Sequence, residues 1–342
     1  MEEDEYFMNY DPYHDDKNKI LELYQEEMKK YRKVKFGFNF NLPIHKGFFH
    51  ENITHIIFGY KFDQALEIGV FPNSVKEIIL STLYNQPLEV GIFPHGLKKV
   101  VFGTFFNQEI LPGLLPNSVT HVKFDLFKKK LLPNVLPESL THLTLGYNYK
   151  EQIMPGVLPK NLEYFDFGGM YNHPLERGIF HDNNLVEGES CKLKHLIFGI
   201  MYNKPILPGI LPNSIKILVL GNKFNDPNYK EILPKRLENL KFGKYFNQPI
   251  KADSLSNRLK ILTFGDNYNQ PIDPGTLPDT LTHLTFGDNY NQPIVPGTLP
   301  DTITHLTFGK GFTQVLSEEN LPKNIICLKL SKKYDKVVKK IK

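Results

Sequence analysis

A nine-residue segment, Phe-Gly-Asp-Asn-Tyr-Asn-Gln-Pro-Ile, occurs at residues 264–272 and again, unchanged, at 286–294. The two copies are 22 residues apart, and the sequence after each copy also repeats, as Pro-Gly-Thr-Leu-Pro-Asp-Thr at 274–280 and 296–302. Self-similarity at a fixed period of about 20–50 residues is typical of stacked-repeat proteins. Because such a chain folds as one stack of small units, its 342 residues do not predict several globular domains.

The same unit continues along nearly the whole chain through an anchor residue, which is usually a Phe that precedes Gly. The anchors are Phe36, Phe58, Leu80, Phe102, Phe124, Leu145, Phe167, Phe198, Leu220, Phe242, Phe264, Phe286, Phe308 and Leu330. All intervals are 22 residues except two. One residue is missing after Phe124, and we place the deletion within 128–130. Nine extra residues follow Phe167, and we place them at 182–190.

Each unit contains a short alternating segment and then a series of turn residues. In one copy, Leu284 and Phe286 alternate with His283 and Thr285, which is the pattern of a half-buried strand. Pro and Gly then recur, and they disfavour a helix and favour turns or extended backbone. Each unit therefore predicts one strand and a helix-poor return, and stacking places the strands in a parallel sheet on one face.

The two ends of the chain differ from the repeats. Residues 1–14 are acidic and lack periodicity, so we expect a mobile acidic leader. Apolar residues spaced by three and four predict a helix over 15–33 that caps the first coil. The repeats then span 34–328, including the insertion at 182–190, and the lysine-rich segment 329–342 predicts a basic C-terminal cap.

The unit resembles the FNIP repeat, a 22-residue relative of the leucine-rich repeat. The resemblance rests on segments such as Phe-Asn-Gln-Pro-Ile at 246–250 and Tyr-Asn-Gln-Pro-Leu at 84–88, which recur in register. It implies an interaction module from a family expanded in social amoebae and amoeba-infecting giant viruses, with no enzymatic motif. The predicted fold is mainly β: a leucine-rich-repeat-like solenoid of about fourteen 22-residue coils, with a parallel sheet on one face, helix-poor returns and an N-terminal capping helix.

Composition bears on the location of the protein and on whether it binds membranes or nucleic acid. The only cysteines, Cys191 and Cys327, lie far apart, and no apolar segment follows the acidic start, so we expect a reduced intracellular location. This location is the cytoplasm, or the host-cell cytoplasm if the chain is viral. No run of about 18 apolar residues is present, so we expect no membrane association. The net charge of +4 does not by itself indicate a nucleic-acid partner.

Asparagines recur five residues after the anchor. They are Asn41, Asn85, Asn107, Asn172, Asn203, Asn225, Asn247, Asn269 and Asn291, with Asp63 and Asp335 as partial substitutes. Stacked side-chain amides can satisfy buried turn amides of neighbouring coils. We therefore interpret this column as a structural asparagine ladder.

Six of the twelve histidines lie three residues before an anchor, on the outward side of the predicted strands. Two pairs, His121 with His142 and His283 with His305, fall in adjacent coils, where facing imidazoles could share a metal ion or form a proton-sensitive patch. No Cys or carboxylate column completes a four-ligand set, so we predict no metal site.

The sequence contains no phosphate-binding Gly-rich loop, nucleophile elbow or zinc-protease motif, so we also predict no catalytic site, no enzyme activity and no cofactor. The predicted function is a non-enzymatic scaffold that binds a protein partner, of unidentified kind, on the surface of the solenoid. The predicted partner-binding residues are His121, Lys123, His142, His195, Lys241, His283 and Thr285.

Two alternative functions remain open. One is a substrate-recognition adaptor of a ubiquitin ligase, although an F-box needs about 45 residues and several helices, and only one helix is predicted before Phe36. The other is weak binding of anionic surfaces or nucleic acid through Lys128–Lys130 and the lysines of 329–342. Neither cluster is interleaved with stacking aromatics, which favours a solvated capping surface over a nucleic-acid partner. The insertion at 182–190 is either a recognition loop or neutral drift, and no sequence feature indicates the oligomeric state.

Overall fold

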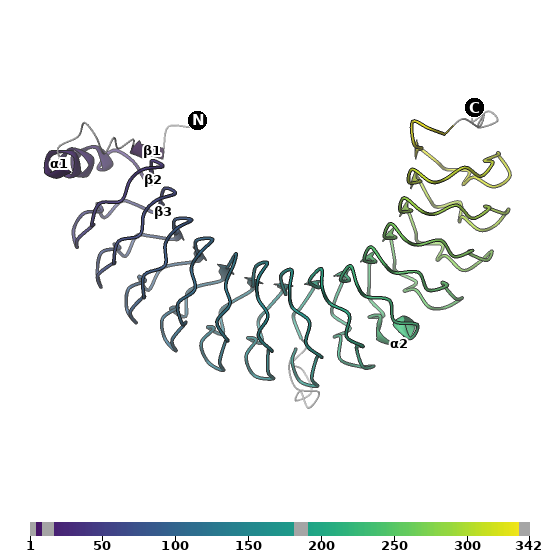
Figure 1. Cartoon of the computed structure of the whole chain (residues 1–342), viewed down its shortest axis with the longest axis horizontal. Coiled ribbons are helices and arrows are strands. Elements are labelled where there is room, and N and C mark those ends of the chain that lie inside the picture. The colour runs from purple at the N-terminus through teal and green to yellow at the C-terminus, as the bar shows by residue number, and fades with distance from the viewer. Residues whose placement is uncertain (1–4, 9–16, 181–190, 335–342) are drawn as a thin grey trace. The chain divides into compact units, whose positions relative to one another are not determined.

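The computed structural model describes residues 5–8, 17–180 and 191–334. The chain forms two compact units, residues 1–168 and 169–342, and each is a stack of coils with one short strand per coil (Figure 1). Neither of the described helices is long and apolar enough to cross a membrane. The insertion predicted at 182–190 lies outside the described residues.

The described part of the first unit contains eight strands that pair in parallel, in chain order, with neighbours in register. They are β1 (Glu5–Met8), β2 (Lys33–Phe36), β3 (His55–Ile57), β4 (Glu77–Ile79), β5 (Lys99–Val101), β6 (His121–Lys123), β7 (His142–Thr144) and β8 (Tyr164–Asp166).

In the second unit, residues 169–180 and 191–334 contain seven strands with the same parallel, sequential pairing. They are β9 (His195–Ile197), β10 (Ile217–Val219), β11 (Asn239–Lys241), β12 (Ile261–Thr263), β13 (His283–Thr285), β14 (His305–Thr307) and β15 (Cys327–Lys329). The predicted leucine-rich-repeat-like solenoid with a parallel sheet is therefore confirmed.

The core of each unit consists of columns in which one coil packs on the next. The middle residue of each strand points inward, and Leu284 on β13 is 1% exposed. The anchor phenylalanines stack on one another, with 5.5 Å between the ring centroids of Phe264 and Phe286. A second aromatic column follows, in which Tyr268 and Tyr290 stack at 5.9 Å. A single coil would leave both columns exposed, so the coils are stable only when stacked.

A close backbone contact between adjacent coils explains why glycine usually follows the anchor. A Cβ atom on Gly287 would collide with the backbone carbonyl oxygen of Gly265 in the preceding coil. The same close approach recurs along the stack, for example between Gly265 and Gly243. Because these turns are packed backbone against backbone, a side chain at Gly265 or Gly287 would require the neighbouring coil to move.

The N-terminal end differs from the sequence prediction. Residues 5–8, within the segment predicted as a mobile leader, form β1 and extend the sheet beyond β2. Helix α1 spans Lys17–Met28 and ends before the predicted bound at residue 33, where the chain already forms β2. Tyr24 and Met28 are buried, as expected for the inner face of a capping helix.

Two further details correct the sequence analysis. Phe127 occupies the aromatic column between Phe106 and Tyr149, with centroid distances of 6.5 and 6.2 Å. The deletion therefore lies between the anchor Phe124 and Phe127, next to Asp125, and not within the lysines 128–130. In addition, one return contains a four-residue helix, α2 (Tyr229–Ile232), whose Tyr229 hydroxyl donates to Pro249 O at 3.1 Å.

The asparagine column lies in the turns after the strands, where all but one of the described asparagine side chains accept a hydrogen bond from the next coil. The Asn269 backbone N–H donates to Asn247 Oδ1, and the Asn291 N–H donates to Asn269 Oδ1, both at 2.9 Å. The side chains of Asn41, Asn85, Asn107, Asn172, Asn225, Asn247, Asn269 and Asn291 accept in this way. In the described part of the chain, Asn203 takes part only as a donor, and Asp335 lies outside that part. At Asp63 a carboxylate oxygen replaces the amide oxygen and accepts from Asn85 N–H at 2.9 Å.

These contacts predict the effect of Asn269→Ala. The substitution leaves the part-buried Asn291 N–H without an acceptor and also removes the bond from Gln292 Nε2, at 3.1 Å. We expect a loss of about 1–3 kcal/mol in the free energy of unfolding, measured by denaturant titration. Asn269→Asp is the matched control, because an Asp already fills this role at position 63, and it should lose less. Equal stability of Asn269→Ala and the wild type would contradict the structural role of the ladder.

Candidate functional site

The outward side of each sheet carries two columns of side chains, one from the first residue of each strand and one from the third. We call them the first column and the third column. The middle residue is buried throughout β2–β14, and the flanking residues are half-buried or exposed except Phe36. Every predicted partner-binding residue lies on one of these two columns.

The predicted residues are divided between the two units. His121, Lys123 and His142 lie on β6 and β7 of the first unit. His195, Lys241, His283 and Thr285 lie on β9, β11 and β13 of the second. Lys123, Lys241 and His283 are exposed and the others are half-buried. Each of the seven is accessible in its own unit, and a role in binding a partner stays a prediction.

Threonines that precede the strands determine the orientation of the paired histidines. The Thr282 hydroxyl donates to Lys260 O at 3.0 Å, so its oxygen accepts from Nδ1 of His283, at 2.9 Å. Thr304 makes the same two contacts, with Thr282 O at 3.2 Å and with Nδ1 of His305 at 2.9 Å. The neutral imidazoles therefore carry their proton on Nδ1, and Nε2 is an acceptor.

The histidine pairs are stacked face to face. The ring centroids of His283 and His305 are 4.3 Å apart with an interplanar angle of 6°, and those of His121 and His142 are 4.1 Å apart at 10°. Parallel rings direct their Nε2 lone pairs side by side, whereas a shared zinc ion needs both nitrogens to converge at about 2.0–2.1 Å. Among the described residues, no group of three or more His, Cys, Asp and Glu could hold a metal ion.

Burial and mutual repulsion favour the neutral rings. Burial, followed by the neighbouring His305, lowers the pKa of His283. Burial, then His142, then Lys99 lower the pKa of His121, while Glu77 opposes them. In the first unit, Glu77 is engaged by Lys99 at 2.8 Å and by His55 Nε2 at 3.9 Å. The first column therefore combines acceptor nitrogens with a local ion-pair row.

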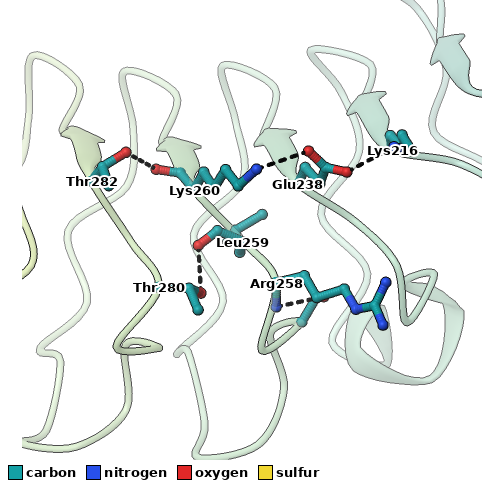
Figure 2. A network of polar contacts seen from close by, with 8 residues as sticks. Lys216, Glu238, Arg258, Leu259, Lys260, Thr280 and Thr282 are labelled. Carbon is teal, nitrogen blue, oxygen red and sulfur yellow. Dashed lines mark hydrogen bonds and ion pairs between the residues drawn. The ribbon is translucent and has the colours of Figure 1, made fainter.

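A second polar row runs just before the strands of the second unit. Figure 2 shows Glu238 between two lysines of adjacent coils, with Nζ–Oε distances of 3.0 Å to Lys216 and 3.3 Å to Lys260. These lysines hold the pKa of the Glu238 carboxyl below its usual range. The pairs are partly exposed and contribute little to stability. They do show that Lys216 and Lys260 have intramolecular partners.

Two features of the second unit were missed from the sequence. Cys327 stands in the first column directly beside His305, which counting back three residues from the anchor Leu330 would have shown. A groove also crosses the carboxyl ends of β11–β15 and includes Lys241 and Thr285. The groove forms only because residues 22 apart come into register, and no local motif indicates it.

Comparison with known proteins gives a consistent family match. Six stretches of the chain match the FNIP Repeat family: residues 40–82, 84–126, 127–170, 202–245, 246–289 and 290–333. Each stretch is about two coils long. Together they cover most of the chain. No curated protein matches the chain.

Among solved structures, the chain is similar to the crystal structure of CroV588, a giant-virus protein described as a novel circular LRR protein structure. The two are 36% identical with a TM-score of 0.80, and the alignment covers 92% of this chain and 48% of that one. This chain therefore spans about half the length of that relative. The crystal structure of the pneumococcal vaccine antigen PcpA aligns over 88% of this chain and 80% of that one, with 14% identity and a TM-score of 0.21, and carries no argument.

The histidine geometry predicts a change in titration for His305→Asn. Removing the neighbouring imidazole removes both a potential like charge and part of the burial, so the pKa of His283 should rise toward its ordinary value. The ring resonances followed by NMR as a function of pH report this pKa directly. His195→Asn, in the same column but away from the pair, should leave it unchanged.

The sign of the effect on stability follows from the lowered pKa. The folded state binds the proton of His283 less readily than the unfolded state, so its contribution to stability is lost as pH falls below about 6.5. A pKa for His283 that stays the same or falls in His305→Asn would contradict the repulsion between the two rings.

Proposed function

Because this chain belongs to the FNIP repeat family, we propose that it is a non-enzymatic protein–protein interaction scaffold that binds a protein partner on the outward face of its solenoid. Solenoids of the leucine-rich-repeat type are typical of such scaffolds. They present a broad, rigid surface that does not depend on a single pocket. The proposed location is the cytoplasm, in keeping with Cys191 and Cys327, which are free thiols.

One observation on the second unit carries this proposal: the inward strand position is constant where outward positions vary. In the second unit the middle residue is Leu on all seven strands, from Leu196 to Leu328. The first column over the same strands reads His, Ile, Asn, Ile, His, His and Cys. The core of the second unit is therefore constant, while each coil presents a different outward surface. A rigid stack with a varied face supports a role in binding a partner.

The charged residues of the face support the same proposal. Lys216, Lys241 and Lys260 are all exposed, but Lys241 is the one of the three with no ion pair among the described residues. Long cationic side chains on a rigid sheet can steer and orient a protein partner, and their removal changes association more than stability. Lys241 is therefore a direct probe of the face.

The test is affinity capture from the natural cell with the full chain as bait, followed by comparison of variants. Lys241→Glu should lower retention of the captured partner by about fivefold or more, because the charge on the binding face is reversed. Lys251→Glu is the matched control, since this exposed lysine lies on a return of the same unit, and it should retain the partner. Recovery of no partner above background, or equal retention by both variants, would contradict the proposal.

The same capture tests one of the two alternatives raised by the sequence, and a polyanion column tests the other. Recovery of ubiquitin-ligase subunits would identify a substrate adaptor. Steeply salt-dependent retention on a polyanion column, reduced by substitution of Lys128–Lys130, would identify a binder of anionic surfaces.

A further inference from the structure

An open groove of about 560 Å³ crosses five strands of the second unit, β11 to β15, at their carboxyl ends. Its floor is the third column together with the packed glycine turns, and its rim is the residue after each glycine. The anchor phenylalanines beneath it are at most 3% exposed. The groove therefore presents polar side chains and backbone, with the aromatic rings covered.

A ladder of three threonines forms the centre of the groove. Thr263 pairs in register with Thr285, and Thr285 pairs with Thr307. All three are half-buried, and their hydroxyls make no side-chain hydrogen bond to another described residue. By contrast, the hydroxyls of Thr282 and Thr304 are fully engaged by a carbonyl and an imidazole. The ladder is therefore a row of unused donors and acceptors at the strand repeat of about 4.8 Å.

Lysines stand at both ends of this ladder. Lys241 pairs in register with Thr263, and Lys329 pairs with Thr307. Both lysines are exposed, and neither forms an ion pair within the described part of the chain. Their positions are four strand intervals apart, which is about 19 Å.

The rim adds no free negative charge. Asp266 is paired with Lys244 at 3.7 Å, and Asp288 with Lys310 at 3.0 Å. The lining contains four lysines and two carboxylates, so the groove has a positive excess located at its two ends. An occupant with matching chemistry has carboxylates about 19 Å apart and polar backbone groups between them.

We infer that this groove binds an extended acidic polypeptide segment that crosses strands β11 to β15. An extended chain rises about 3.3 Å per residue, so acidic side chains about six residues apart reach Lys241 and Lys329 together. The peptide backbone between them hydrogen-bonds to the threonine ladder. The inference rests on the proposed interaction role and specifies the chemistry of the partner.

The groove suits a polypeptide better than single-stranded nucleic acid or a small molecule. Nucleic-acid channels combine a continuous basic path with aromatic rings on which bases stack. Here the rings are covered and two carboxylates interrupt the path. Small molecules are bound in enclosed, mostly apolar pockets, whereas this groove is open and lined by lysine, aspartate and threonine side chains.

The test uses a fluorescein-labelled peptide with one glutamate at each end of five neutral Gly, Ser and Thr residues, which places the carboxylates six residues apart. Control peptides carry the same two glutamates side by side, or glutamines in their place. Fluorescence anisotropy with the full chain should show binding of the spaced peptide, weaker binding of the adjacent-charge peptide and least of the neutral one.

Variants of the groove locate the contact. Lys241→Gln and Lys329→Gln should each weaken binding about two- to fivefold, as expected for exposed ion pairs. Thr285→Val should weaken it about two- to tenfold through a lost hydrogen bond. Lys251→Gln is the control and should bind as the wild type does, and thermal unfolding should show that all four variants fold.

Several outcomes would overturn the inference: no binding of the spaced peptide, equal binding of the adjacent-charge peptide, or an affinity unaffected by the groove variants. Lysine-dependent binding of oligo(dT) without binding of the peptide would also overturn it. If the peptide does not bind but the wild-type chain still retains its captured partner, the groove assignment fails and the interaction role stands. If no partner is captured, the interaction role itself fails.

Discussion

In-register stacking of the coils is the constraint on which the rest of each unit depends. Each strand is only three residues long in most coils, too short to hold a sheet together by itself. The stack is stabilised by the strand ladder and the asparagine column, which hydrogen-bond residues one coil apart, and by the aromatic columns, in which rings of adjacent coils pack on one another. A shift of one coil by one residue relative to the next would misalign all three sets of contacts at once. This explains why the one shortened coil loses its residue at Asp125, before the aromatic column, and restores the register at Phe127.

The same constraint shapes the outward face. Because successive strands are in register, every outward side chain lies beside its counterpart in the next coil, and residues 22 apart form extended rows. The stacked histidines, the Lys216–Glu238–Lys260 row and the threonine ladder are three instances. In the histidine row, the threonine hydroxyls and the histidine Nδ1 atoms are already engaged in hydrogen bonds within the chain. Where the hydroxyls and lysines lack intramolecular partners, as in the groove of the second unit, the row is available to a ligand.

Most of the fold could be predicted from the sequence because the period and the alternation of Leu284 and Phe286 with His283 and Thr285 act locally and repeat. The strand β1 could not, since Glu5–Met8 has no repeat pattern and forms a strand only by pairing with β2. The outward position of the predicted binding residues followed from strand alternation. The groove did not, because the lysines at its two ends, Lys241 and Lys329, are 88 residues apart and neither is unusual in its own coil. The groove is formed by residues of successive coils, so the sequence indicates it only after the coils have been aligned in register.

The central claim, that side-chain acceptors from one coil hold the turn of the next, is tested most directly by amide hydrogen exchange at single-residue resolution. The backbone N–H groups of Asn107, Asn269 and Asn291 lie in turns but donate to side-chain oxygens of the preceding coil at 2.9 Å. The account predicts that these amides exchange as slowly as the strand amides of the same coils. Exchange at the rate of ordinary exposed turn amides would contradict it.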